Sequence, residues 1–273
     1  MNYSFLKNTK CVLLDMDGTI YLGNTVFEGT KPFLEMLEHN GISYLFLTNN
    51  SSRSTKTYIE KLNNMNISAE RKHMLTSAHA SAAYINERYK NKRTYVLGTD
   101  ALKEEMREMG INVVTDKPEL VLMGFALELT YQDLTTICNY VRSGLPYICT
   151  HPDINLPIED GIVPDIGCNI AFIHASTGRY PDAICGKPSE QMLAAAEAQT
   201  SISRKEMLMV GDRLYTDIAL RQFGIKTVLV LSGETSIEAA ENSEFKADLV
   251  LKDIAELHNV LLESIQGDKN EHN

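Results

Sequence analysis

Short apolar runs alternate with amphipathic stretches along almost the whole chain, and this alternation constrains the fold more than any other feature. The clearest runs cover residues 11–14, 44–47, 95–97, 120–125, 147–149, 207–210, 227–231 and 249–251. Continuous apolar runs of this length are typical of parallel strands that are buried on both faces. Because helical patterns lie between them, we predict an α/β fold built on a doubly wound parallel sheet.

The helical patterns have recognisable ends. Residues 31–40 place Phe33, Leu34 and Leu37 on one side, with Pro32 in the first turn and Gly41 just beyond the last. Residues 188–199 begin with a proline and repeat apolar residues at helical spacing. Both patterns predict helices that pack against a sheet.

Composition excludes several classes of protein. The 273 residues carry a net charge of −10, whereas a protein that reads a nucleic-acid backbone needs a basic surface. The five cysteines form no CxxC pair, which favours free thiols in a reducing cytoplasm over disulfides or a zinc site. No run approaches the roughly 20 apolar residues of a membrane span, and residues 1–10 lack the apolar stretch of a signal peptide.

Four groups of polar residues come directly after apolar segments of the chain, at the points where ligands bind in parallel sheets. Ligands of such sheets bind beyond the carboxyl ends of the strands. The residues in question are Asp15 and Asp17, then Thr48, Asn49 and Asn50, then Gly186 and Lys187, and finally Gly211 and Asp212. One site at this edge of the sheet explains all four groups.

The first group belongs to the segment Asp15-Met16-Asp17-Gly18-Thr19. An ordinary strand-to-loop turn is the alternative, because Asp and Gly are common in turns. Two carboxylates spaced i, i+2 off an extended strand end lie on the same side, however. A divalent cation relieves the repulsion between them, so the motif favours a metal site.

The second and third groups suit a phosphate. A hydroxyl and backbone N–H groups at a helix start can bind phosphate oxygens, which favours Thr48, Asn49 and Asn50. The same segment could simply cap a helix over residues 55–62 through Ser51, Ser52 or Ser54. Lys187 could neutralise a phosphate, although a lysine before a helix is more often a solvated surface residue.

The fourth group gives Asp212 as a candidate metal ligand and Asp217 as a supporting residue. The alternative for Asp217 is a favourable charge near a helix start. Hard oxygen ligands prefer Mg²⁺ to zinc, and the histidines are scattered along the chain. We therefore predict Mg²⁺ as the cofactor.

In order and spacing, these motifs resemble the haloacid dehalogenase-like hydrolases. Finer features, such as residues 47–53 and 211–218, resemble its NagD-like, p-nitrophenylphosphatase-type branch. The resemblance implies a phosphatase in which Asp15 is the nucleophile and Asp17 the acid and base. It implies Mg²⁺ on Asp15, on the Asp17 backbone carbonyl and on Asp212. It also implies phosphate binding by Thr48, the Asn49 backbone and Lys187, with Gly18, Thr19 and Asp217 supporting the site.

The branch also implies a discontinuous catalytic core, expected at residues 1–72 and 183–273, with an inserted α/β cap at residues 73–182. In the cap, Thr150-His151-Pro152-Asp153 stands where the branch commonly carries Thr-Asn-Pro-Asp, so His151 is a departure. We expect Asp153 to bind substrate and this loop to help choose the leaving group. A polar turn before proline is the alternative.

The expected partner is a small phosphorylated metabolite, with no nucleic acid and no membrane, and a homodimer is possible because such caps often take part in dimers. A protein that binds a phosphate ligand without turnover is the rival hypothesis, and the intact set Asp15, Asp17, Lys187 and Asp212 argues against it. Dehalogenation is disfavoured because the acid/base and metal residues are present. A mutase would need a cap between residues 18 and 48, which is too short a stretch. A phospho-accepting signalling domain would be less than half this length.

Overall fold

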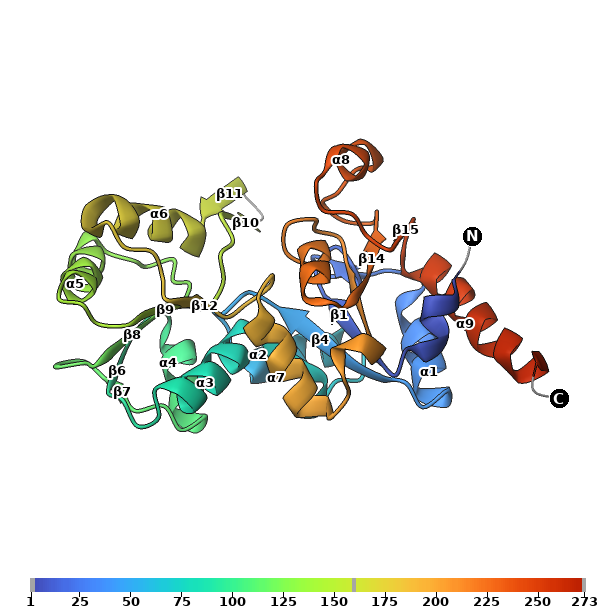
Figure 1. Cartoon of the computed structure of the whole chain (residues 1–273), viewed down its shortest axis with the longest axis horizontal. Coiled ribbons are helices and arrows are strands. Elements are labelled where there is room, and N and C mark those ends of the chain that lie inside the picture. The colour runs from blue at the N-terminus through green and yellow to red at the C-terminus, as the bar shows by residue number, and fades with distance from the viewer. Residues whose placement is uncertain (1–2, 159–160, 272–273) are drawn as a thin grey trace. The chain divides into compact units, whose positions relative to one another are not determined.

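The computed structural model describes residues 3–158 and 161–271, and the chain divides into two compact units (Figure 1). The first unit comprises Met1–Leu47, Ile59–Met74 and Ala196–Asn273. The second comprises Thr48–Tyr58 and Leu75–Ala195. The division into a catalytic core and a cap at residues 72/73 and 182/183 stays a prediction.

The first unit is built on a six-stranded sheet. In order across the sheet the strands are β15 (Leu249–Leu251), β14 (Lys226–Val230), β13 (Met207–Gly211), β1 (Cys11–Asp15), β4 (Ser43–Thr48) and β5 (Met74–Thr76). The pairings from β15 to β4 are parallel. The chain winds outward from β1 in one direction and from β13 in the other. The strand order therefore reverses between β1 and β13, which is where a doubly wound sheet binds its ligands.

Helices cover this sheet. Helix α1 (Thr30–His39) and helix α9 (Ile254–Glu271) lie side by side (Figure 1). Helix α1 buries Phe33, Leu34 and Leu37, because residues three and four apart share one face of a helix. The remaining helices that enter this unit are α2 (Thr55–Asn64), α7 (Glu190–Thr200) and α8 (Ile237–Asn242).

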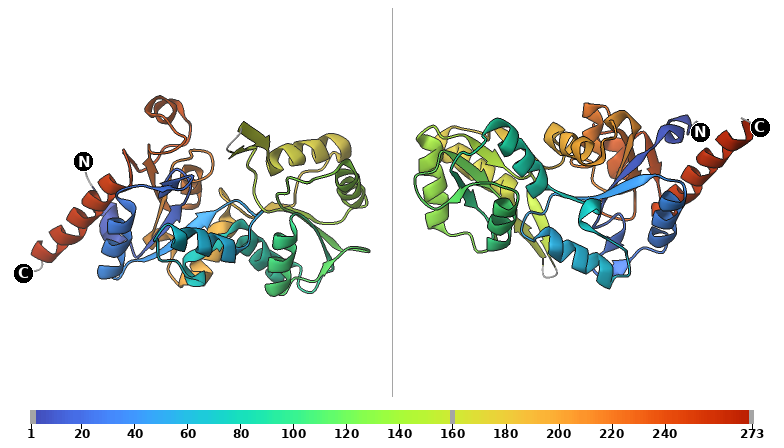
Figure 2. Two further views of the ribbon diagram at one scale, coloured as in Figure 1. Left: turned by 180° about the vertical axis from the view of Figure 1, so that it is seen from behind. Right: turned by 90° about the horizontal axis from the view of Figure 1, so that it is seen from below.

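The second unit is built on a five-stranded parallel sheet. Its order is β12 (Ala183–Ile184), β9 (Tyr147–Cys149), β8 (Leu120–Met123), β6 (Thr94–Leu97) and β7 (Val113–Val114). Helices α5 (Tyr131–Arg142) and α6 (Ile166–Thr177) cover one face, and α3 (Ser77–Arg88) and α4 (Asp100–Glu108) cover the other (Figure 2). An antiparallel hairpin, β10 (Asn155–Ile158) and β11 (Gly161–Pro164), leads into α6.

The sheet of the second unit has a continuous apolar core on its α5–α6 face. Its members are buried aliphatic, aromatic and sulfur side chains: Leu97, Val121, Met123, Phe125, Ile137, Cys138, Val141, Tyr147, Cys149, Ile166, Ile170 and Ile173. Burying a large aliphatic or aromatic side chain stabilises the folded state by about 1.5–3 kcal/mol, and this is the main source of stability for such a layer. The second unit therefore carries a core of its own.

The sequence predictions of the fold are confirmed. All eight apolar runs contain strands, and both predicted helices form, as α1 and α7. The strands that were not predicted are short ones: β5, β7, β10, β11, β12 and the hairpin of β2 (Tyr21–Leu22) with β3 (Thr25–Val26). The cysteines are free thiols. Within residues 3–158 and 161–271, every helix is too short or too polar to cross a membrane.

Asp248, which precedes β15, ties this edge of the first sheet together. Its carboxylate accepts hydrogen bonds from Arg221 Nε at 3.0 Å, Lys226 Nζ at 2.9 Å and the Thr227 backbone N–H at 3.0 Å. Burial works against the charged form, but these donors outweigh it and hold the pKa of Asp248 below its ordinary value. A carboxyl with a depressed pKa stabilises the fold above its unfolded pKa, and this contribution disappears as the pH falls through the folded pKa.

We therefore expect Asp248→Asn to lower the free energy of unfolding at pH 7 by about 1–3 kcal/mol, the usual value for hydrogen bonds to a charged group. The difference from wild type should shrink as the pH falls below about 4, the ordinary pKa of Asp. Denaturant unfolding between pH 3 and pH 7 measures both. Asp100→Asn is the control, because Asp100 is almost fully exposed in its pair with Lys103. If the difference in free energy of unfolding between Asp248→Asn and wild type does not vary with pH, the ionised Asp248 carboxylate does not stabilise the fold in this way.

Candidate active site

Asp15 and Asp212 follow neighbouring strands of the first sheet. Asp15 is the last residue of β1, and Asp212 comes directly after β13. The two strands are parallel, with Leu14 opposite Val210, so their carboxyl ends meet at one edge. Asp217 joins them, and one carboxylate oxygen of each residue lies within 4.8 Å of the others. The sheet thus brings together three of the residues that the sequence singled out.

Glycines make room for these carboxylates. A Cβ atom on Gly18 would lie 2.5 Å from Asp212 Oδ2, and one on Gly233 would lie 2.0 Å from the same oxygen. Gly18 also has a φ of +88°, which a side chain would strain. A Cβ atom on Gly211 would lie 2.3 Å from the Asp217 carboxylate. Each of these positions therefore tolerates only glycine while the carboxylates keep their places.

The loop after β14 holds Asp212 in place and was missed by sequence reasoning. The backbone N–H of Glu234 donates to Asp212 Oδ2 at 2.7 Å. The hydroxyl of Ser232 donates to the Gly18 carbonyl at 2.7 Å, which joins this loop to the first motif. The available signal was position, because residues 232–234 follow the apolar run 227–231 at the same edge of the sheet.

The negative charges at this edge of the sheet repel one another. Burial, followed by the negative charges of Asp15 and Asp217, raises the pKa of Asp212 to about 8. The pKa of Asp17 is also raised, first by loss of hydration, while Lys61 opposes the shift and Asp15 adds to it. Asp17 keeps an exposed surface and lies outside the three-carboxylate cluster.

The three carboxylates fit a divalent cation. Asp212 Oδ1 is buried and has no hydrogen-bond partner among the described residues, so it is an orphaned acceptor. Hard cations such as Mg²⁺ take oxygen ligands of this kind. A cation there would both satisfy the orphaned oxygen and offset the repulsion that raises the Asp212 pKa.

Arg213 is a second residue at this site that the sequence reasoning did not single out. Its backbone N–H donates to Asp217 Oδ2 at 3.1 Å, and its side chain forms an ion pair with Glu234 at 3.0 Å. Burial opposes the charged guanidinium, but the charges of Asp15 and its other neighbours raise the pKa of Arg213. Arg213 thus brings one positive charge to the acidic cluster.

Of the remaining predicted residues, Thr19 is fully buried in the first unit, and the others belong to the second unit. Thr48 ends β4, and its hydroxyl accepts from the Asn50 N–H at 3.2 Å. The Asn50 side chain accepts from the backbone N–H of Ser52 at 2.9 Å. Ser54 Oγ accepts from the Thr57 N–H at 3.3 Å, so Ser54 caps α2 as one of the predicted alternatives had it. The loop is therefore a compact turn at the start of a helix.

Lys187 and Asn49 are joined directly. Lys187 follows β12 and is only 2% exposed. Its backbone N–H donates to Asn49 Oδ1 at 2.7 Å, and its carbonyl accepts from Asn49 Nδ2 at 2.8 Å. The Asn49 amide also donates to Asp153 Oδ1 at 2.9 Å. Three of the predicted site residues are thus brought together in the second unit.

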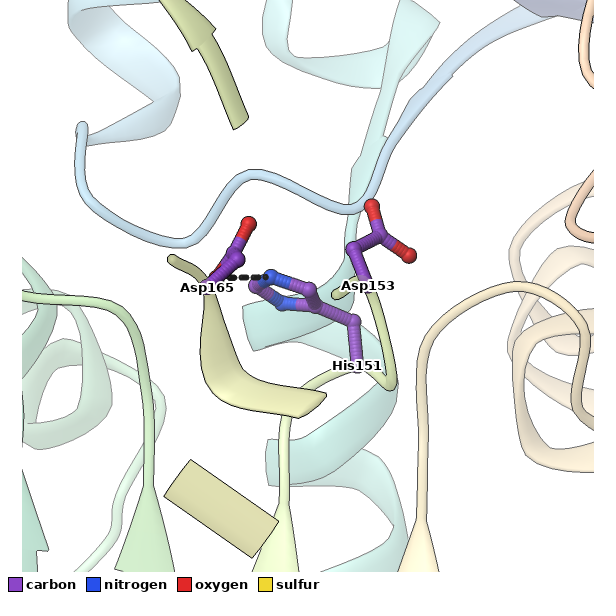
Figure 3. Close-up of side chains that lie close together, drawn as sticks. All are labelled: His151, Asp153 and Asp165. Atoms are coloured by element: carbon purple, nitrogen blue, oxygen red, sulfur yellow. Dashed lines mark hydrogen bonds and ion pairs between the residues drawn. The ribbon is translucent and has the colours of Figure 1, made fainter. Parts of the chain in front are cut away.

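Thr150, His151 and Asp153 are buried in the loop after β9. His151, which is fully buried, bonds through Nε2 to Asp165 Oδ1 at 3.1 Å and through Nδ1 to the Thr150 hydroxyl at 3.0 Å. Asp165 also accepts from the Ile166 N–H at the start of α6. Figure 3 shows the imidazole turned toward Asp165, with the carboxylate of Asp153 pointing away from the ring. These groups already have protein partners, because His151 and Asp165 bond to each other and Asp153 Oδ1 accepts from the Asn49 amide.

Comparison with known proteins agrees with this geometry. Residues 12–112 match a family model described as haloacid dehalogenase-like hydrolase, and residues 184–257 match one described as HAD-hydrolase-like. An acid sugar phosphatase from Staphylococcus aureus is 33% identical over 253 residues, which cover 92% of this chain and 97% of that protein.

Solved structures give the same result. A 4-nitrophenylphosphatase from Thermotoga maritima superposes with a TM-score of 0.89 at 40% identity, covering 93% of this chain and 98% of that one. A glycerol phosphate phosphatase from Mycobacterium tuberculosis, solved in complex with calcium, superposes with a TM-score of 0.84 at 29% identity. The match covers 93% of this chain and 76% of that one. With its strand-end carboxylates and these relatives over nearly its whole length, the chain belongs to the haloacid dehalogenase-like hydrolases, among the NagD-like and p-nitrophenylphosphatase-type phosphatases that hydrolyse phosphoric monoesters.

Proposed function

We propose that this phosphatase depends on Mg²⁺ and hydrolyses its substrate through a phospho-aspartate on Asp15. The observation that carries the proposal is the cluster of Asp15, Asp212 and Asp217 at the point where the strand order reverses. Asp15 is half-buried at the end of β1, whereas Asp212 and Asp217 are almost fully buried. The accessible carboxylate is therefore the one suited to attack a substrate.

The chemistry divides into two displacements. Asp15 attacks phosphorus, and the bond to the leaving oxygen breaks while Asp17 donates a proton to that oxygen. In the second step Asp17 takes a proton from the attacking water, and the carboxylate of Asp15 is released. The raised pKa of Asp17 supports the first role, because an acid must be protonated before it can donate.

The carboxylates of Asp15 and Asp212 and the backbone carbonyl of Asp17 would hold Mg²⁺, with Asp217 in support. When bound, the cation offsets the repulsion between a carboxylate and a dianionic phosphate. Gly18 and Thr19 shape the turn: the Gly18 N–H donates to the Tyr21 carbonyl at 2.7 Å. The hydrogen bond from the Glu234 N–H fixes the orientation of the Asp212 carboxylate.

Phosphate oxygens would be bound by Thr48, Asn50 and Lys187, and by the backbone of Asn49. Support comes from their chemistry, since a hydroxyl, N–H groups at a helix start and an ammonium are all good phosphate ligands. Residues 73–182 would form the cap that selects the leaving group, with residues 1–72 and 183–273 as the catalytic core. The contact of Asp153 with substrate stays a prediction.

The first substrates to test are sugar phosphates and glycerol phosphate, because relatives of this chain are named for them. A cytoplasmic location is consistent with the free thiols of all five cysteines. A homodimer is one possible assembly, on the resemblance alone. A screen of purified protein against phosphorylated metabolites, followed by sedimentation, tests substrate and assembly separately.

Replacement of the nucleophile gives the most direct test. We expect Asp15→Asn to lower kcat by at least about 10³-fold, because an amide cannot form the phospho-enzyme. The fold should be retained, as checked by circular dichroism. Beryllofluoride with Mg²⁺ should bind the wild type and not the variant. Turnover within about tenfold of wild type would exclude a phospho-aspartate at this residue.

A second prediction separates the two roles of Asp17. With p-nitrophenyl phosphate the leaving group departs without a strong need for an acid, whereas release of phosphate from Asp15 still needs a base. Asp17→Asn should therefore give a rapid burst of about one equivalent of p-nitrophenol, followed by slow turnover. Stopped-flow absorbance measures the burst. A slow reaction without any burst would mean that the base step does not limit the variant.

Metal dependence is the third prediction. Activity should disappear in EDTA and return on addition of Mg²⁺, because the ligand set is all oxygen. Asp212→Ala should weaken Mg²⁺ binding by at least about tenfold in calorimetric titration, since Asp212 contributes the orphaned oxygen. Full activity in EDTA, or a preference for Zn²⁺ over Mg²⁺, would rule out the proposed site.

A further inference from the structure

The side chain of Asn49 is fully engaged by protein groups. It is 6% exposed, and it makes three hydrogen bonds, two to the backbone of Lys187 and one to Asp153. The two bonds to Lys187 pair one amide with the N–H and the C=O of a single residue. This is the two-point pairing that a neighbouring strand would give, made here by a side chain.

Asp153 fixes the direction of that amide. An ionised carboxylate only accepts hydrogen bonds, so the Asn49 NH₂ group must face Asp153 Oδ1 at 2.9 Å. The Asn49 carbonyl then faces the Lys187 N–H, which can only donate. Reversing the amide would place oxygen against oxygen at Asp153 and nitrogen against nitrogen at Lys187. Both partners therefore select one orientation.

Gly186 leaves the space that this arrangement needs. A Cβ atom at this position would lie 2.6 Å from Asn49 Oδ1, 2.6 Å from the Thr150 carbonyl oxygen and 2.8 Å from His151 Cβ. Real Cβ atoms do not approach other atoms so closely. The backbone at 186–187 is thus packed tightly against Asn49 on one side and the loop after β9 on the other.

We propose that Asn49 is a positioning residue that acts through Lys187, and that Asp153 serves it by orienting its amide. A lysine side chain carries a point charge on a flexible four-carbon stem, so fixing its backbone narrows the region that the ammonium can reach. Small displacements of a charged group at a reacting centre cost large factors in rate. The inference rests on the proposed function, in which Lys187 binds the phosphate.

A double-mutant cycle tests the inference. Asn49→Ala, Lys187→Ala and the double variant are compared by kcat/KM and by the inhibition constant of inorganic phosphate. Asn49→Ala should lower kcat/KM by about 10–100-fold in the wild-type background and by less than about twofold when Lys187 is already alanine. The phosphate inhibition constant should follow the same pattern. The unfolding midpoint should fall equally in both backgrounds, because Lys187→Ala keeps the backbone that Asn49 binds.

Asn86→Ala provides a matched control. Its side chain donates to the Met109 carbonyl at 3.0 Å in the same unit, so the change removes an asparagine-to-backbone bond outside the site. Its kinetics should equal those of the wild type. If Asn49→Ala does not fold, Asp153→Ala takes its place in the cycle, because it releases the amide while leaving Asn49 itself present.

The outcomes separate the inference from the function on which it rests. A kcat/KM of Lys187→Ala equal to wild type would remove the proposed role of Lys187 and leave the hydrogen bonds a purely structural feature. If Lys187→Ala is impaired but the second substitution multiplies the loss by its full factor, Asn49 acts independently and the positioning role is overturned. If Asn49→Ala lowers kcat/KM only when Lys187 is present, the positioning role is supported.

Discussion

Repulsion among carboxylates at one edge of a parallel sheet is the constraint around which the first unit is organised. Parallel pairing places Asp15 and Asp212 together because their strands end at the same edge. Asp217 adds a third charge, and the pKa of Asp212 rises to about 8 as a result of burial and these neighbours. The raised pKa favours the protonated form of Asp212, so protons and a cation would compete for this carboxylate.

In the second unit, hydrogen bonds from distant residues fix the polar loop at the start of α2. The segment Thr48–Tyr58 groups with residues that lie far along the chain. Ser77 Oγ donates to the Asn49 carbonyl at 2.6 Å, and Thr99 Oγ1 donates to the Ser52 carbonyl at 2.9 Å. Such bonds fix a loop better than its own short turns could, because each joins it to a helix or strand end.

Much of the fold followed from the sequence, since buried parallel strands have continuous apolar runs and helices have an apolar face. The two-residue strands β7 and β12 were missed because so short a segment has no readable period. The residue types of the site were readable from strand-end positions. Gly233 was not, because its role is to leave space for Asp212, and the need for space depends on tertiary packing.

The grouping of Thr48–Tyr58 with Leu75–Ala195 has a consequence for the exchange of parts between relatives. A recombinant that joins the first 72 residues of one homologue to the following segment of another would separate Ser51 from Thr150 and Glu105 from Thr55, which hydrogen-bond here. Such a hybrid would present each loop residue with a partner selected in a different protein. The natural module for exchange is therefore discontinuous, and a transplant of residues 75–195 has to bring residues 48–58 with it.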